Sequence, residues 1–270
     1  MSMTQPPRAS DPSAATATPE ADLAELRHRM ARASRWVVLS GAGMSAESGI
    51  PTFRDAQTGL WAHLDPEQLA SEAGYRADPA LVWDWYETRR EGVRQARPNA
   101  GHVALANYAH RFAGRLTVIT QNVDDLHQRA GSPGVLRLHG DLLADRWLGR
   151  CAQPSFSGHG CEPRQARPGR PPHCSRCGNL VRPGVVWFGE PLPATTWAQA
   201  EAAVDQAELL LVVGTSGAVW PAAGLAARAR RHEAFVAVLN PATSAIDDEA
   251  HLHLRGTAAT LLPALLDPLR

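Results

Sequence analysis

The sequence contains no lysine, so every basic side chain other than histidine is an arginine. The protein therefore cannot carry a modification on a lysine of its own. Neither charge sign is in excess, because 27 basic residues balance 27 acidic ones. This balance argues against nucleic acids or anionic membranes being bound through net charge. Long apolar runs are also lacking: none approaches the roughly 20 residues that a membrane-spanning helix needs.

The first nineteen residues are poor in charged side chains and rich in Ser, Thr, Ala and Pro. They lack a basic start followed by an apolar stretch, so we expect no secretory signal. A transit peptide is disfavoured because Arg8 is the one basic residue in this segment. The composition of residues 1–19 predicts a disordered tail.

Cysteine is scarce and confined to one short segment. The four cysteines are Cys151, Cys161, Cys174 and Cys177. In a chain without a secretory signal, such a cluster favours metal binding over disulfides, and we expect a cytoplasmic protein. Cys174 and Cys177 form a Cys-x-x-Cys knuckle followed by Gly178, which eases a turn around a tetrahedral metal.

Apolar, β-branched runs recur along the rest of the chain and alternate with helix-like segments. The runs are 36–39, 116–120, 209–213 and 235–239, and helical spacing covers 20–33, 197–207 and 222–231. Strands that alternate with helices predict an α/β fold with a Rossmann-like parallel sheet.

Two segments interrupt this alternation. Residues 56–100 are mostly helical in pattern, with Pro66 and Pro79 suited to first helical turns. Residues 146–182 are rich in Pro, Gly, Arg and Cys, have little periodicity, and would need a metal to hold them together. We therefore predict a Rossmann-like domain from 20–55, 101–145 and 183–270, a helical insertion at 56–100, and a metal-binding module at 146–182.

The most informative stretch follows the first apolar run. It reads Gly41-Ala42-Gly43-Met44-Ser45-Ala46-Glu47-Ser48-Gly49-Ile50-Pro51-Thr52-Phe53-Arg54-Asp55. A glycine-rich turn after a buried strand lets backbone N–H groups approach a phosphate. A dehydrogenase fingerprint does not need the Pro-Thr-Phe-Arg continuation, so that class is disfavoured. The stretch resembles the signature of the sirtuin family, the NAD-dependent protein deacylases. By that resemblance Gly41, Ala42, Gly43, Ser45, Glu47, Phe53 and Arg54 belong to the NAD site.

A second polar element, Thr120-Gln121-Asn122-Val123-Asp124, ends a predicted strand. On composition alone, a nucleotide contact and a cap for the next helix are equally good interpretations. The element resembles the Gln-Asn-(Ile/Val)-Asp motif of sirtuins, which implies that Gln121, Asn122 and Asp124 line the NAD site and that Asn122 also takes part in catalysis. His139, in Leu138-His139-Gly140, stands where sirtuins carry their catalytic histidine. The resemblance implies that it removes a proton from the ribose of NAD, a role that suits an imidazole near neutral pH.

Three later segments extend the resemblance, which covers residues from about 35 to 262. Turns at strand ends place Gly214, Thr215, Ser216 and Asn240 near the nucleotide, and Ala258 matches the adenine-contacting segment more weakly. The run Val186-Trp187-Phe188-Gly189-Glu190 resembles the sirtuin strand that pairs with an extended acylated-lysine substrate.

The cysteines depart from the sirtuin pattern, which has two Cys-x-x-Cys pairs. Here nine residues separate Cys151 from Cys161, so the first half of a four-cysteine zinc site would be stretched. A metal-free module, or a site completed by His159 or His173, remains open as an alternative.

The acyl specificity is predicted from Tyr86 and Arg89, which share a helix face at their spacing. A phenol and a guanidinium together suit a carboxylate. A solvated arginine and a tyrosine at the edge of the core are the ordinary alternative. The spacing resembles the Tyr-x-x-Arg of class III sirtuins, and Ala70 falls where that class has a small residue. This implies desuccinylase, demalonylase or deglutarylase activity without excluding deacetylation.

The resemblance thus implies an enzyme that transfers the acyl group of acylated-lysine proteins to ADP-ribose and releases nicotinamide, with NAD and Zn²⁺ as cofactors. We expect no direct nucleic-acid or membrane partner. A protein ADP-ribosyltransferase or NAD glycohydrolase on the same fold, and a non-catalytic NAD-sensing module, are the alternatives.

Overall fold

The computed structural model describes residues 19–51, 66–149 and 166–269. These residues form a six-stranded parallel sheet in the order β3-β2-β1-β6-β7-β8. Counted along the sheet strands only, this is the 3-2-1-4-5-6 order of Rossmann folds. The strands are β1 (Trp36–Ser40), β2 (Leu116–Thr120), β3 (Leu136–Arg137), β6 (Leu209–Val213), β7 (Phe235–Leu239) and β8 (Leu252–Leu254).

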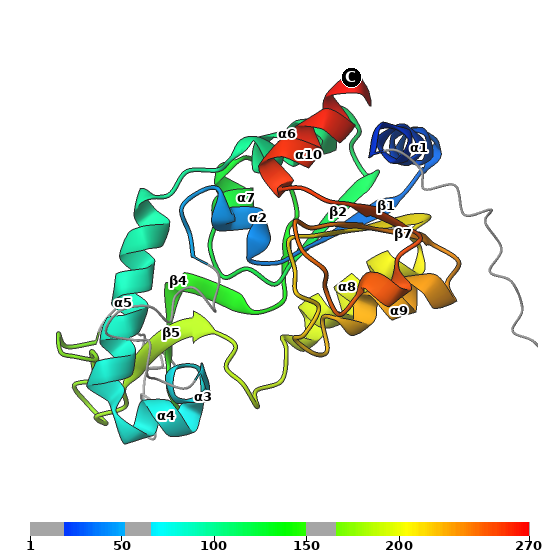
Figure 1. Ribbon diagram of the computed structural model, residues 1–270. Helices are drawn as coiled ribbons and strands as arrows, with labels where there is room; N and C mark the ends of the chain where they lie inside the picture. Colours follow the sequence, from blue (N-terminus) through cyan, green and yellow to red (C-terminus); the bar gives the residue numbers. More distant parts are fainter. Residues whose placement is uncertain (1–18, 52–65, 150–165, 270) are drawn as a thin grey trace, which may run out of the picture.

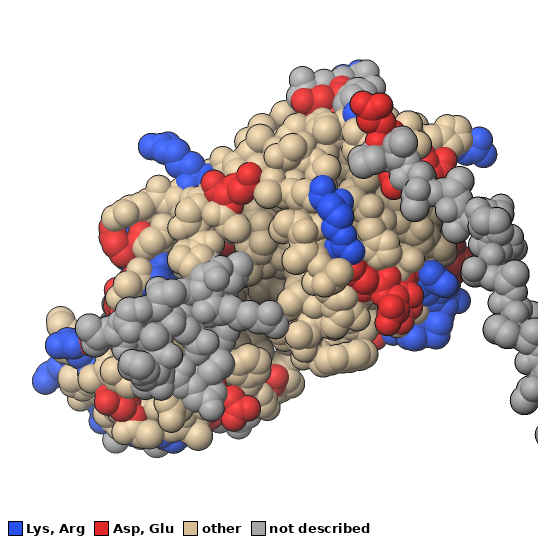
Figure 2. All heavy atoms as spheres, viewed as in Figure 1, with Lys and Arg blue, Asp and Glu red and all other residues tan. Residues whose placement is uncertain are grey.

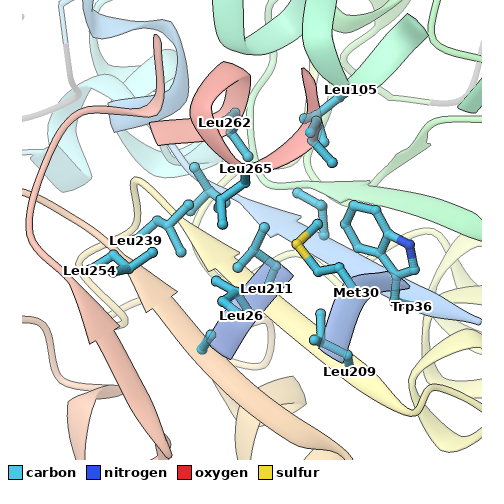
Figure 3. Packing of buried hydrophobic residues seen from close by; sticks show 14 of the residues in the cluster. Leu26, Met30, Trp36, Leu105, Leu209, Leu211, Leu239, Leu254, Leu262 and Leu265 are labelled. Atoms are coloured by element: carbon cyan, nitrogen blue, oxygen red, sulfur yellow. The ribbon is translucent and has the colours of Figure 1, made fainter. Parts of the chain in front are cut away.

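Helices cover both faces of this sheet (Figure 1). On one face lie α1 (Pro19–Arg32), α6 (Ala100–Arg111) and α10 (Ala258–Leu266), and their apolar side chains meet those of the strands. Figure 3 shows this packing, with Leu26 and Met30 of α1, Leu105 of α6 and Leu262 of α10 converging on the sheet. The other face is covered by α8 (Ala194–Asp205) and α9 (Gly224–Arg231).

The central strands are buried on both faces, which explains their sequences. Every residue of β1 and β6 is buried. A parallel sheet covered on both sides needs near-continuous apolar runs rather than alternation. The strands predicted from those runs are confirmed to within one residue, and helices occupy the segments around 20–33, 197–207 and 222–231 where they were expected.

A second, smaller lobe packs beside the carboxyl ends of the strands (Figure 1). It contains α3 (Pro66–Leu69), α4 (Glu72–Ala77), α5 (Pro79–Gln95) and an antiparallel pair, β4 (Gly140–Trp147) and β5 (Val181–Val185). Their apolar side chains form a core of their own. Pro66 and Pro79 begin helices as predicted. The predicted boundaries of the insertion and of the cysteine-rich module stay predictions.

Short elements complete the described chain. They are α2 (Gly43–Ala46), α7 (Leu126–Arg129), and the 3-10 turns η3 (Asp247–Glu249) and η4 (Asp267–Leu269). Within the described ranges, no helix combines the length and the apolar character that crossing a bilayer requires.

Candidate active site

A cavity lies beyond the carboxyl ends of the strands, at the point between β1 and β6 where the strand order reverses. Chain connections leave β1 and β6 toward opposite sides, and such switch points, beyond the carboxyl ends of parallel strands, are where ligands bind. The described residues enclose a cavity of about 1310 Å³ there. This exceeds the roughly 300–1,000 Å³ of a pocket for one small molecule. Figure 2 shows this face hollowed near its centre. The cavity has room for a dinucleotide and a second ligand.

Two glycine turns bring bare backbone to the floor of the cavity. The Gly43 N–H donates to the Gly214 carbonyl at 2.7 Å. A Cβ at Gly43 would lie 2.8 Å from Gly214 Cα, and one at Gly41 would lie 2.7 Å from Thr215 Cβ. Only glycine allows the turns after β1 and β6 to approach this closely. This pair of glycine turns forms a cradle without side chains that lines the cavity, and it fits a phosphate-bearing ligand bound against backbone N–H groups.

Polar side chains from α2 and from the loop after β2 meet beside this cradle. Asn122 Nδ2 donates to Ser45 Oγ at 3.1 Å, and Ser45 Oγ donates to Asp124 Oδ2 at 2.9 Å. Burial raises the pKa of Asp124, while hydrogen bonds from the Leu126 N–H and from Ser45 oppose that rise. The chain of bonds fixes all three side chains at the cavity wall, where they can meet hydroxyl or amide groups of a ligand.

His139 is oriented by a backbone carbonyl. Its Nδ1 lies 2.9 Å from the Gln121 oxygen. Because a carbonyl only accepts, Nδ1 carries the proton and the Nε2 lone pair is left to act as a base. Burial lowers the pKa of His139, against a smaller opposing effect of this hydrogen bond. The imidazole, which lines the cavity, is therefore neutral near pH 7 and suited to accept a proton.

Tyr86 and Arg89 lie one turn apart on α5 and line the same cavity as His139. The Arg89 guanidinium lies 4.7 Å from the centre of the Trp85 ring and 5.8 Å from that of Tyr86. Burial lowers the pKa of Arg89 and raises that of Tyr86. Ala70 lines the cavity with no more than a methyl group. This end of the cavity combines a cation, a phenol and free space.

The neighbouring Arg90 has a different role, although it carries the same group. It is buried and donates to the carbonyls of Leu142 and Ala144 and to the carboxylates of Glu87 and Asp145. These bonds anchor α5 to β4. Arg90 therefore holds the helix while Arg89 faces the cavity.

The predicted substrate strand lines the cavity from Val186 to Glu190, just after β5 ends. Several of its N–H groups already have partners inside the protein. Val186 donates to the His139 carbonyl at 2.9 Å, and Phe188 donates to the Ala70 carbonyl at 2.8 Å. Trp187 donates through its backbone to Glu190 Oε2 at 2.9 Å.

The remaining predicted nucleotide residues differ in position. Gly41, Ala42, Gly43, Glu47, Gln121, Gly214, Thr215, Ser216 and Asn240 line the cavity. Gln121 Nε2 donates to Thr215 Oγ1 at 3.1 Å, and Asn240 Nδ2 donates to the Thr215 carbonyl at 3.2 Å. Ala258, the first residue of α10, is buried in the core, and its neighbour Thr257 lines the cavity instead. Phe53 and Arg54 lie outside the described residues.

Sequence reasoning missed several residues of the cavity wall. Trp85, Thr88 and Gly92 line it from the face of α5 that carries Tyr86 and Arg89, and helical spacing alone could have found them. Val219 and Trp220 line it from the segment after Gly214–Ser216, and Trp220 is 73% exposed. No local pattern marks these two.

Of the four predicted metal ligands, the structure describes Cys174 and Cys177. The Arg176 N–H lies 3.4 Å from Cys174 Sγ, and Gly178, at φ +71°, donates to the Cys174 carbonyl at 2.9 Å. A tight turn that directs an N–H at a sulfur fits a zinc knuckle. Cys151 and Cys161 lie outside the described residues, as does His159. Within the described ranges, no cluster of three or more metal-ligating side chains is found.

Comparison with known proteins adds independent findings. Residues 41–221 match the Sir2 family. The NAD-dependent protein deacylase of Ralstonia nicotianae is 51% identical over 243 residues, which cover 90% of this chain and 95% of the relative. NAD-dependent protein deacylase 1 of Pseudomonas aeruginosa is 49% identical over 239 residues, covering 88% and 95%.

Solved structures of Sir2 proteins are also similar to this chain. A Sir2 homologue in complex with NAD has a TM-score of 0.78 and 39% identity, covering 92% of this chain and 93% of that one. A Sir2 complex with a p53 peptide and NAD⁺ has a TM-score of 0.75 and 28% identity, covering 90% and 97%.

Proposed function

This chain belongs to the Sir2 family and is an NAD-dependent protein deacylase, and from that premise we propose that it removes acidic acyl groups, such as succinyl and malonyl, from lysine side chains. The single observation that carries this proposal is the placement of Tyr86 and Arg89 on one face of α5, in the wall of the cavity that also contains His139.

The nucleotide end of the cavity is assigned to NAD. We propose that the glycine cradle of Gly41, Gly43 and Gly214 holds its phosphates and that Asn122 and Asp124 hold the nicotinamide side. NAD supplies the ADP-ribosyl group that receives the acyl group. Ser45 keeps the side chains of Asn122 and Asp124 in place through its two hydrogen bonds.

His139 is assigned as the general base. Its Nε2 would accept a proton from a ribose hydroxyl, and the bond from Nδ1 to the Gln121 carbonyl keeps the ring in the tautomer that this step needs. The peptide around the acyl-lysine would lie along residues 186–190.

The acyl end is assigned by charge. Arg89 would hold the distal carboxylate, with Tyr86 as a second donor, and the small Ala70 side chain leaves room for the extra atoms. An acetyl group has no carboxylate, so the arginine contributes selectively to acidic acyl groups.

Arg89→Met tests this proposal. It should lower the kcat/KM ratio of succinyl-lysine to acetyl-lysine peptides roughly ten- to a hundredfold, because a hydrogen bond to a charged group is worth about 1.5–3 kcal/mol. The matched control is Arg94→Met on the same helix, whose side chain is exposed and outside the cavity wall. Equal losses on both peptides would make Arg89 structural and refute the acidic-acyl specificity.

We also propose one structural zinc ion per chain, bound by Cys151, Cys161, Cys174 and Cys177. What supports this is the chemistry of four clustered thiols and the knuckle-like turn of Cys174–Gly178. The zinc would supply folding free energy to a segment with few apolar residues.

A further inference from the structure

The Tyr86 hydroxyl is held from behind by an indole. Trp187 Nε1 donates to the Tyr86 oxygen at 2.9 Å, and both side chains are buried to about 2% exposure. The two residues are 101 positions apart in the chain. Among the described residues, no acceptor is found for the Tyr86 O–H itself.

We propose that Trp187 is a positioning residue for acyl selectivity: its N–H occupies one lone pair of the Tyr86 oxygen and so directs the Tyr86 O–H into the acyl end of the cavity. This inference rests on the proposed binding of acidic acyl groups at Tyr86 and Arg89. It gives the Trp187 side chain a role separate from peptide pairing by its backbone.

The geometry of a phenol explains the effect. A tyrosine hydroxyl has one proton and two lone pairs, so it can donate once. With the Trp187 N–H already aimed at the oxygen, the hydroxyl proton is directed away from the indole. Burial raises the pKa of Tyr86, so the phenol stays protonated and remains a donor throughout the neutral range. A carboxylate in the cavity is the acceptor that this donor lacks.

Trp187 is itself fixed by a partly buried ion pair. The Arg182 guanidinium lies 3.2 Å from the centre of the Trp187 ring and pairs with Glu190 at 2.5 Å. Glu190 also accepts the Trp187 backbone N–H at 2.9 Å. Tyr75 packs against the same indole, with ring centres 5.2 Å apart. Ring and backbone of Trp187 are therefore held together, as a positioning residue requires.

Trp187→Phe is the test, because it removes the N–H and keeps an aromatic ring. We expect the succinyl-to-acetyl kcat/KM ratio to fall about three- to tenfold, the range of one neutral hydrogen bond. The loss should be in KM for the succinyl peptide, because the contact is remote from the reacting bond. In Tyr86→Phe, the further change Trp187→Phe should have no additional effect on the ratio, since the two act as one unit.

Tyr75→Phe is the matched control. It removes a buried hydroxyl that donates to the Val181 carbonyl in the same cluster, outside the cavity wall. It should lower stability and leave the ratio unchanged. A general packing defect would instead lower kcat/KM for both peptides together.

The outcomes distinguish a failure of this inference from a failure of the proposed function on which it rests. If Tyr86→Phe lowers the ratio and Trp187→Phe does not, or if their effects add, the inference is overturned and the proposed function stands. If Arg89→Met and Tyr86→Phe both leave the ratio unchanged, the proposed function is wrong and the inference falls with it.

A second measurement covers the case in which Trp187→Phe does not fold. In the folded wild-type protein, the indole N–H resonance of Trp187 should shift more with a succinyl-lysine peptide than with an acetyl-lysine peptide, and Tyr86→Phe should abolish the difference. Equal shifts with both peptides would overturn the inference.

Discussion

At the residue scale, protonation states decide what the cavity can do. Burial keeps His139 neutral and Tyr86 protonated near pH 7. The first is thus available as a base and the second as a donor. In each case a hydrogen bond fixes the side chain, from His139 to the Gln121 carbonyl and from Trp187 to Tyr86.

His139→Ala should lower deacylation by about 10²- to 10⁴-fold, because a general base is lost. Fold and NAD affinity should change little, as measured by circular dichroism and calorimetry. The control is His28→Ala, an exposed histidine of α1. In the wild type, kcat/KM should fall with decreasing pH only below the ordinary histidine range of about 6.5, because burial lowers the pKa of His139. A folded His139→Ala protein with near-normal turnover would refute the assignment.

At the element scale, the glycine turns that follow β1 and β6 pack directly against each other. Gly214, at φ +61°, turns the chain where an ordinary side chain would be strained, and its carbonyl receives the Gly43 N–H. The floor of the cavity therefore depends on contact between two loops that are far apart in sequence.

Gly43→Ala should destabilise the protein by about 1–3 kcal/mol, since the new methyl group would overlap rigid backbone at Gly214. NAD affinity should fall as well. Urea unfolding and calorimetry measure the two effects. Gly149→Ala is the matched control, because the nearest atom to its Cβ would be 4.0 Å away. Unchanged stability of Gly43→Ala would show that the loops separate easily.

A second feature at the element scale is a pair of buried histidines, one on α6 and one on α7, whose rings are in contact. The rings of His102 and His127 lie 4.8 Å apart, and burial lowers their pKa values to about 3 and about 4. His102 Nε2 and His127 Nδ1 have no hydrogen-bond partner among the described residues. The folded protein therefore resists protonating either ring.

The pH dependence of stability follows from that resistance. Unfolded histidines take up protons below about pH 6.5. The histidines of the folded state stay neutral at that pH, so protonation favours the unfolded state. The free energy of unfolding is therefore unaffected by these two histidines above about pH 6.5, and it decreases as the pH falls toward 4 and then 3. At pH 5 the loss is on the order of 2 kcal/mol per histidine. His127→Gln should make the slope shallower in urea titrations at pH 7, 6 and 5. A slope equal to that of the wild type would contradict this account.

At the scale of the whole molecule, two lobes meet at one cavity. The Rossmann-like lobe lines one side of the cavity, which we propose binds the nucleotide. Residues of α5, β4 and β5, in the smaller lobe (Figure 1), line the side that we propose binds the acyl group. Charged side chains of both signs are scattered over the face in Figure 2, and no cluster of one sign gathers among the described residues there. The proposed selection of acidic acyl groups would then depend on Arg89 in the cavity wall.

We propose that zinc bound by the cysteine-rich segment stabilises the smaller lobe. We expect about one zinc ion per chain by elemental analysis, and Cys174→Ser should lower both zinc content and melting temperature, because metal ligation supplies folding free energy. Ser175→Ala, between the two cysteines of the knuckle, is the control. A folded, active protein without zinc would show that this segment is a metal-free module.

Much of the fold and the nucleotide site could be predicted from local sequence. Continuous apolar runs identify buried parallel strands, and Gly41–Gly43, Gln121–Asp124 and Gly214–Ser216 each follow such a strand directly. Because parallel strands end at the same edge, the sequence by itself determined that these turns would share one cavity. Helical spacing likewise determined that Tyr86 and Arg89 share a face.

Only the tertiary structure decided which partners these residues meet. Nothing local distinguishes Arg89 from Arg90, and packing against β4 makes one an anchor and leaves the other in the cavity wall. Likewise Ala258 turns into the core and Thr257 into the cavity. The bond from Trp187 to Tyr86 joins residues 101 positions apart. Periodicity describes neighbours along the chain, whereas such contacts depend on how separate elements pack, and that is fixed only when the whole chain has folded.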